Sequence, residues 1–240
     1  MLLKSTDPLE RYLVELVQAQ GMLGSHEHAF ASSITTHQQL CVTAFHEFAG
    51  YLNDAFQGDD ELIVSHDLRV QCEIGAAHID HLIITRFLDV FLIESRISGD
   101  ELFIGEDEEF SVRYRDGTSF RIRSPITQLR RGLAVAQHIF RRIELPIKFG
   151  ETIVPTFHRY VLLPENTRLI NRSQVRGDYF VSSKDLVRTV KRAAQRSPIK
   201  ALLLGLSAER LREIARIVVR WHTPEKVDFI RKYLATPAVD

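Results

Sequence analysis

Cysteine is scarce in this 240-residue sequence, which contains only Cys41 and Cys72. The two residues lack the spacing of metal ligands, and we expect them to be buried thiols in a reducing cytoplasm. Long apolar runs are also missing, since none approaches the roughly 18 residues that cross a bilayer. Residues 1–10 are too acidic, and their apolar run is too short, for a secretory signal. The sequence therefore predicts a cytoplasmic globular protein without a membrane partner.

The chain has no net charge. Lys and Arg total 31, as do Asp and Glu, which argues against a general polyanion-binding protein. The charges are nevertheless segregated. Residues 100–109 hold six acids and no base, residues 113–142 hold eight arginines and one acid, and residues 184–200 hold six bases and one acid. A neutral chain with this pattern can carry a basic face that contacts phosphate.

Residues 76–97 form the most informative stretch. They contain two apolar, β-branched runs, 77–85 and 88–93, joined by a short connection. Runs of this kind are typical of buried strands. Two carboxylates interrupt them, Asp80 inside the first run and Glu94 at the end of the second.

The predicted pairing of these two runs brings the carboxylates together. In a hairpin closed by the short connection, Asp80 lies opposite Glu94 and Leu82 lies opposite Leu92. Opposed residues share a face, with Cβ atoms about 4.5–5.5 Å apart. Two like charges at that distance need a shared proton or a bound cation. Arg96 projects from the same face, although a connection one residue longer or shorter would turn Glu94 to the opposite face.

Helices and short strands are predicted around this hairpin. Apolar periodicity predicts helices over residues 8–20, 38–56, 126–143, 184–195, 208–220 and 224–234, and strands over residues 62–70, 102–104, 109–114, 119–122, 160–163 and 179–181. Ser124 and Ser183 are the expected helix caps, and residues 24–37 read as a polar loop. We expect the strands between residues 102 and 122 to lie outside the core.

The order of these elements indicates an α/β fold, a mixed sheet flanked by helices. We divide the chain into an N-terminal helical extension (1–37), a core (38–198) and a C-terminal helical tail (199–240). Self-association through the terminal helices is one role that these additions could have.

Four motifs in the core resemble the nuclease-related domain (NERD) family of PD-(D/E)XK restriction-endonuclease-like nucleases. They are Glu47 in FHEFAGYL, Ile79-Asp80-His81, Ile93-Glu94-Ser95-Arg96, and Ser124-Pro125-Ile126-Thr127-Gln128. The family has a Gly-Glu helix, IDH, IEtK and NP-x-x-Q in this order. Two positions depart from it, because Arg96 stands where the family has Lys and His46 where a Gly often precedes the helix Glu. The resemblance implies a restriction-endonuclease-like sheet with an αβββαβ core.

This resemblance also implies a chemistry, the hydrolysis of DNA phosphodiester bonds with Mg²⁺ or Mn²⁺. Asp80 and Glu94 are suitable ligands, the carbonyl oxygen of Ser95 is a third candidate, and the family assigns Glu47 to the same metal. Arg96 could stabilise negative charge but cannot act as a base, because a guanidinium stays protonated. Gln128 matches the family Gln that positions groups near the site.

Non-catalytic roles stay open for the same residues. Arg96 could form a salt bridge with Glu94 or Asp80 that replaces the metal, which would leave a catalytically degenerate module for nucleic-acid binding or protein assembly. Glu47 could be a solvated helix acid, and Gln128 could bond a helix end.

Two further sets of residues offer weaker signals. The histidines near residues 26–46, with His78 and His81, could suggest a zinc hydrolase, but no HExxH or CxxC accompanies them. The basic residues of the helix over 184–195 fit a solvated face better than a nucleic-acid contact.

Overall fold

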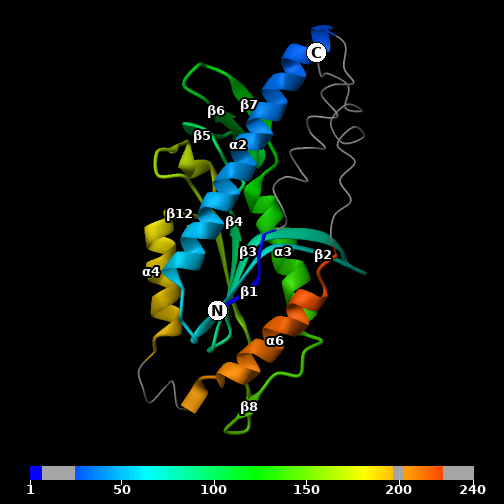
Figure 1. Cartoon of the computed structure of the whole chain (residues 1–240), viewed down its shortest axis with the longest axis vertical. Coiled ribbons are helices and arrows are strands. Elements are labelled where there is room, and N and C mark those ends of the chain that lie inside the picture. The colour runs from blue at the N-terminus through cyan, green and yellow to red at the C-terminus, as the bar shows by residue number, and fades with distance from the viewer. Residues whose placement is uncertain (7–24, 197–202, 224–240) are drawn as a thin grey trace.

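The central element of the structure is a six-stranded mixed sheet (Figure 1). The computed structural model describes residues 1–6, 25–196 and 203–223. The strand order is β1 (Leu2–Lys4), β2 (Leu62–Cys72), β3 (Gly75–Thr85), β4 (Asp89–Glu94), β10 (Thr156–Leu162) and β12 (Phe180–Val181). Strands β2, β3 and β4 are antiparallel, whereas β1, β10 and β12 each pair in parallel with a neighbour. This arrangement confirms the predicted α/β fold.

The hairpin of β3 and β4 has the register that the sequence predicts. Leu82 pairs with Leu92 and Ile84 pairs with Val90. The connection needs no Gly, because Leu88 adopts a left-handed conformation with φ 58°. Its backbone N–H donates to the carbonyl of Thr85 at 2.9 Å, which closes the turn. Alternation along both strands then directs side chains to two separate hydrophobic cores.

Helices cover both faces of the central sheet (Figure 1). On one face, α3 (Pro125–Phe140) and α6 (Ala208–Arg220) pack on the core that contains Leu82 and Leu92. On the other, α2 (Ser25–Ala55) and α4 (Ser183–Ala194) pack on the core that contains Ile83 and Ile93. The helices exclude water from strands that are apolar on both faces.

A second sheet has the order β11 (Arg168–Ile170), β5 (Glu101–Ile104), β6 (Phe110–Arg113) and β7 (Ser119–Ile122). The prediction that these strands lie outside the core is wrong. Leu102, Ile104, Phe110 and Val112 are at most 1% exposed and belong to the same core as α3. Their short alternating pattern hides this burial, since only one face of the sheet is apolar.

The remaining elements are short. Strands β8 (Ile147–Lys148) and β9 (Glu151–Thr152) form a hairpin, and two 3-10 turns span Glu106–Glu108 and Arg172–Gln174. Among the residues described, no helix is long and apolar enough to cross a membrane. Cys41 is buried, Cys72 is half-buried, and both are free thiols.

Several predicted boundaries need correction. Helix α2 begins at Ser25, so residues 25–37 are helical and not a loop. No Gly or Pro interrupts the sequence between Ser25 and Gly50, and polar residues alone do not end a helix. The caps are Ser124, as predicted, and Ser182 in place of Ser183. The predicted helices over residues 8–20 and 224–234 lie outside the described residues, and the division into extension, core and tail stays a prediction.

Candidate active site

Two buried carboxyl groups meet where β3 and β4 approach the second sheet. The paired register ends at His81 and Ile93, and the next position brings Asp80 to Glu94. Asp80 is 0% exposed and Glu94 is 4% exposed. The antiparallel pairing places the two carboxyl groups opposite one another on one face, which is the close approach that the sequence predicts.

The backbone at the end of β4 holds Asp80 in place. Its Oδ2 accepts hydrogen bonds from the backbone N–H groups of Ser95 at 2.8 Å and Arg96 at 3.1 Å, and from the Ser95 hydroxyl at 3.2 Å. Its Oδ1 lies 3.0 Å from Arg96 Nε and 3.1 Å from His78 Nδ1. These two ion-pair contacts lack hydrogen-bond geometry, so Oδ1 is a buried oxygen without a hydrogen bond.

A third acid, Asp67 on β2, joins this site and was not predicted. It is 2% exposed, and it lies between the pairs that β2 forms with His81 and Ile79 of β3, level with Asp80. Its φ of 56° interrupts the ladder there. Asp67 Oδ1 accepts from Arg96 Nη2 at 2.6 Å and from His78 Nε2 at 2.7 Å. One signal could have found it, a carboxylate inside the apolar strand LIVSHDLRV.

Burial and neighbouring charges separate the pKa values of the paired acids. Burial, and then the charge and hydrogen bond of Asp80, raise the pKa of Glu94 well above its usual value. Burial also opposes the charge on Asp80, but Arg96 and His78 outweigh it and hold the pKa of Asp80 below its usual range. Glu94 is therefore the protonated partner and Asp80 the ionised one.

His78 completes the charge balance. Burial and the charge of Arg96 lower the pKa of His78, but its hydrogen bond to Asp67 and its close contact with Asp80 outweigh them and raise it. Arg96 and His78 thus face Asp67 and Asp80 as two cations against two anions. The guanidinium of Arg96 also lies over the ring of Phe45, 4.6 Å from its centroid.

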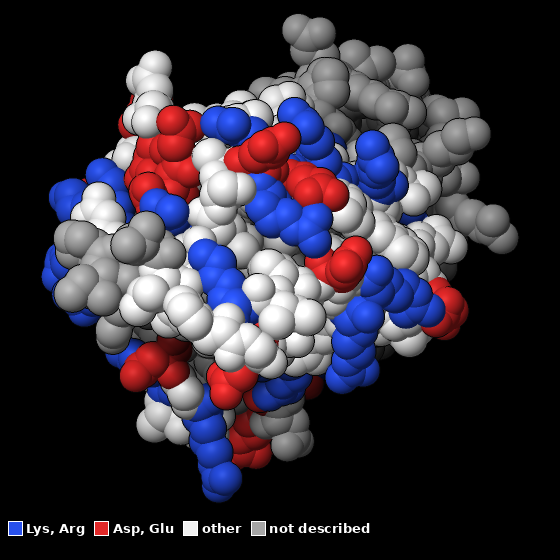
Figure 2. All heavy atoms as spheres, turned by 90° about the horizontal axis from the view of Figure 1, so that it is seen from below, with Lys and Arg blue, Asp and Glu red and all other residues white. Residues whose placement is uncertain are grey.

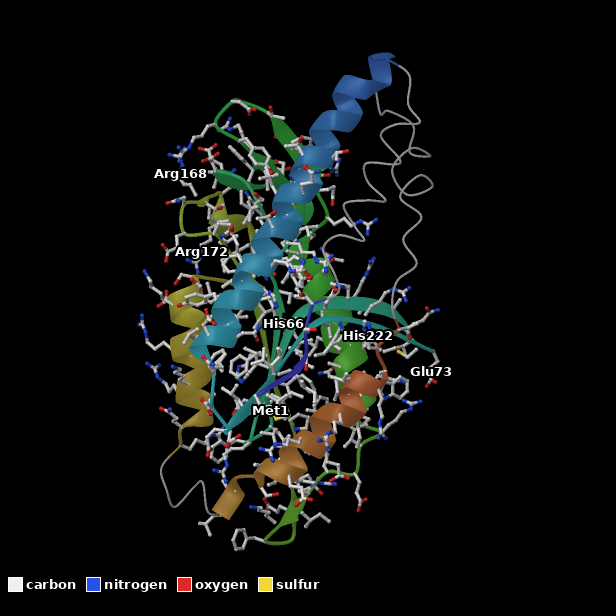
Figure 3. All side chains as sticks on the ribbon, viewed as in Figure 1. Met1, His66, Glu73, Arg168, Arg172 and His222 are labelled. Atoms are coloured by element: carbon white, nitrogen blue, oxygen red, sulfur yellow. The ribbon has the colours of Figure 1, made fainter. Side chains whose placement is uncertain are left out.

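A chain of hydrogen bonds runs from Ser95, a donor to Asp80, through two histidines to α2. The Ser95 hydroxyl lies 2.7 Å from His81 Nε2, His81 Nδ1 lies 2.8 Å from His66 Nδ1, and His66 Nε2 lies 3.0 Å from the Asn53 side chain on α2. Figure 3 shows His66 between α2 and the sheet. Burial lowers the pKa of His66 to about 4 and that of His81 to about 3, so both rings are neutral near pH 7.

The site opens into a cavity of about 750 Å³ between α2, β7 and the start of α3. Glu94, Arg96 and Gln128 line it, together with Arg69, Arg121, Arg123 and Arg131. Among the described residues that line the cavity, Glu94 is the only acid, so arginines outnumber acids there. The outer surface differs, since Figure 2 shows acidic and basic side chains interspersed at the end of the molecule that is lowest in Figure 1.

The acidic segment decides which arginines stay available. Asp100, Glu101, Glu108 and Glu109 form ion pairs with arginines of the following segment, Arg115, Arg113, Arg130 and Arg121 respectively. In the described part of the chain, Arg123 and Arg131 form no ion pair. These acids thus pair with other arginines, and Arg123 and Arg131 line the cavity without an acidic partner among the described residues.

Four of the five predicted site residues come together, and Glu47 does not. Asp80, Glu94 and Arg96 are in contact, and Gln128 lies on the first turn of α3 in the cavity wall. Glu47 is exposed on α2 and has no ion pair or hydrogen bond with a described residue. The reason is helical geometry, because Phe45 is buried against the site and a residue two positions on points to the other side.

The described residues contain no group of three or more His, Cys, Asp or Glu side chains arranged for a metal ion. The predicted zinc alternative therefore gains no support from them. His37 bonds Tyr114, His78 bonds acids, and His81 bonds Ser95 and His66. Mg²⁺ is a different case, because it is commonly held by one or two carboxylates and several waters.

Comparison with known families identifies the family of the chain. The model of the family described as "Nuclease-related domain" (NERD) matches residues 45–164, half of the chain, and the match includes all five predicted site residues. No curated protein and no solved structure matches the sequence. The chain belongs to the nuclease-related domain family, within the restriction-endonuclease-like PD-(D/E)XK superfamily, and its function is accordingly nuclease-related.

Proposed function

We propose that this protein binds DNA and hydrolyses its phosphodiester bonds with Mg²⁺ or Mn²⁺. One observation carries the proposal: Asp80 and Glu94 form a buried carboxyl pair beside an arginine-lined cavity. Nuclease-like families commonly use divalent metals. A buried acid pair is costly to maintain for structure alone.

The donor set suits a hard divalent cation. Asp80 and Glu94 would hold it, with the carbonyl oxygen of Ser95 as a third ligand. Two features support this assignment: Asp80 Oδ1 has no hydrogen bond, and Glu94 retains a proton because a second negative charge beside Asp80 is unfavourable. A bound divalent ion supplies an activated water and neutralises charge on the phosphate.

The protein's own residues bind and orient the phosphate. Arg96 presents a planar fork that suits phosphate oxygens, and it remains charged throughout. Gln128 can donate its amide hydrogens from the wall of the cavity. The N-terminus of α3 adds a partial positive charge. Asp67 and His78 contact both side chains and fix the position of Arg96 relative to Asp80.

A cleavage assay tests the proposal. We expect the purified protein to cleave DNA in Mg²⁺ or Mn²⁺ and to stop in EDTA. Asp80→Asn keeps the size of the side chain but removes its charge, and should lower the rate by about 10²–10³-fold or more, the scale seen when one stabilising group is lost. Arg216→Gln, on the exposed side of α6, is the matched control and should cleave normally. Undiminished cleavage by Asp80→Asn would overturn the proposal.

A second function is favoured by the salt bridges of Arg96. Arg96 and His78 already neutralise Asp67 and Asp80, so the same fold could bind nucleic acid without metal or catalysis. Thermal unfolding separates the two functions. A resident metal site predicts stabilisation of about 2.7 kcal/mol when Mg²⁺ is at 100 times its Kd, lost in Glu94→Gln. The binding-only function predicts no change in melting temperature with Mg²⁺.

Other partners and locations stay predictions. Self-association through the terminal helices would involve α6 and the start of α2, together with segments outside the described residues. A cytoplasmic location is consistent with the free thiols of Cys41 and Cys72.

A further inference from the structure

We propose that the cavity takes single-stranded nucleic acid, with one unpaired base seated against the partly exposed ring of Phe120, which stacks on the buried ring of His37. The inference rests on the proposed function only in taking nucleic acid as the ligand. It does not depend on hydrolysis, so the two can fail separately.

The rings of His37 and Phe120 form an aromatic wall that lines two neighbouring cavities. His37 on α2 and Phe120 on β7 are stacked, with centroids 4.6 Å apart and an interplanar angle of 14°. Tyr114 meets both rings edge-on at 6.0 Å. Its hydroxyl lies 2.7 Å from His37 Nδ1, which fixes the ring of His37. The wall is thus built from segments far apart in sequence and is held rigid.

A second pocket adjoins the arginine-lined cavity across this wall. Its volume is about 270 Å³, and His37 and Phe120 line both hollows. Leu40 and Tyr114 give the pocket apolar surface, while Asp116 and Thr118 give it polar groups. A flat aromatic ligand with hydrogen-bonding edges suits such a lining, and a nucleobase has this form.

Phosphate-binding charge lies next to the same rings. Arg121 follows Phe120 on β7, Arg123 comes just after the strand, and Arg131 extends from α3; all three line the cavity. Arg123 and Arg131 have no ion pair with described residues, so each is available to a phosphate. A basic channel beside aromatic side chains is the usual composition of sites that bind single strands.

The ring stack distinguishes a single strand from a duplex. In a duplex each base is stacked and paired, so a base reaches a protein ring only after it is flipped out or unpaired. Phosphate contacts alone serve both forms. The wall of His37 and Phe120 adds affinity only where a base is free, and Glu94 and Arg96 line the adjoining cavity.

The test is fluorescence anisotropy of the native protein in EDTA, which prevents metal-dependent cleavage. The probes are a 12-nucleotide thymidine single strand and a DNA hairpin duplex with the same number of phosphates. We expect the single strand to bind at least about ten-fold more tightly. Phe120→Leu preserves apolar packing but removes the ring face, and should weaken single-strand binding by about ten-fold while leaving duplex binding unchanged.

Two matched variants control for charge and folding. Arg131→Gln should weaken both probes and reduce the salt dependence of binding by about one phosphate contact, whereas Arg216→Gln should change neither. Thermal melting of Phe120→Leu checks that the fold is intact, and Phe120→Tyr should retain single-strand affinity because it keeps an aromatic face.

Equal affinity for both probes, or unchanged single-strand binding in a folded Phe120→Leu protein, would overturn the inference. Mg²⁺-dependent cleavage of duplex alongside such a result would leave the proposed function standing. Tight single-strand binding without cleavage would support the inference and remove the hydrolytic function.

Discussion

The two ends of β4 carry the same kinds of side chain in different arrangements. At its start, Asp89 is buried, and its two oxygens are bonded to His158 at 2.9 Å and Arg196 at 2.7 Å. At its end, Asp80 of β3 also meets a histidine and an arginine, but a second carboxyl group, Glu94, adjoins it.

This difference separates a carboxylate whose two oxygens are both bonded from a site in which one buried carboxylate oxygen has no hydrogen bond. Each oxygen of Asp89 has its own hydrogen-bond partner, and Asp89 lines neither of the two cavities described above. Near Asp80, the acids outnumber the cations, one acid keeps its proton, and one buried oxygen lacks a hydrogen bond. Buried acids therefore indicate function when their partners leave something unsatisfied, and not merely because they are buried.

The largest expected effect comes from making the same substitution, Asp to Asn, at each end of β4. Asp80→Asn should lower cleavage by about 10²–10³-fold or more. Asp89→Asn should leave cleavage unchanged but destabilise the fold by about 1–3 kcal/mol, because the amide keeps only one acceptor oxygen and one of the partners, His158 or Arg196, loses its acceptor. Cleavage rates and urea unfolding of both variants measure the contrast. Loss of cleavage in a folded Asp89→Asn protein would break the comparison.

A smaller effect concerns the buried histidines behind the site. The pKa of His66 is about 4 and that of His81 about 3, against about 6.5 in an unfolded chain. The unfolded state therefore binds more protons below about pH 6.5, and stability, complete above that pH, falls as the pH decreases toward 4. His78, whose pKa is raised, acts in the opposite direction: its contribution is complete below about pH 6.5 and decreases above it, so it offsets part of the loss between pH 7 and pH 5.

Urea unfolding at pH 7 and pH 5 measures this loss. His66 alone accounts for about 2 kcal/mol over that interval. His66→Gln should make the pH dependence shallower by about that amount. A stability that stays flat between the two pH values would contradict the neutral state of these rings.

The smallest effect tests the division between paired and unpaired arginines. Glu109→Gln removes the partner of Arg121 on an exposed surface, where such a pair contributes about 0–1 kcal/mol. Stability should therefore hardly change. Binding of a single strand should become more salt-dependent by about 0.7 in the logarithmic slope, because one more cation faces the phosphates. An unchanged slope would mean that Arg121 already contacts the strand while paired.

Much of the fold follows from local patterns. The register of β3 and β4 was predictable because apolar alternation and a short connection act over fewer than 20 residues. The start of α3 was predictable because Ser124 and Pro125 are local signals, and the Ser124 hydroxyl does accept from the Thr127 N–H at 3.2 Å. The burial of the second sheet was not predictable from local patterns, since it depends on contacts with α3 and on pairing with β11, which is formed by residues 168–170.

The candidate site divides in the same way. Asp80 and Glu94 were predictable as a pair because they lie on one hairpin. The position of Glu47 was not predictable, because it depends on the rotation of α2 about its axis. Phe45 sets that rotation through its contacts with His81 and Arg96.

The sequence by itself determined the family, the paired carboxylates and the segregation of charge, since each is written in neighbouring residues. The tertiary structure decided which charges remain unsatisfied. Asp67 entered the site from another strand, Arg96 took two acids as partners, and the acidic segment neutralised some arginines but left Arg123 and Arg131 at the cavity. The physical reason is that ion pairing and desolvation depend on distances through space, which residues remote in the chain set only when the sheet and helices have packed.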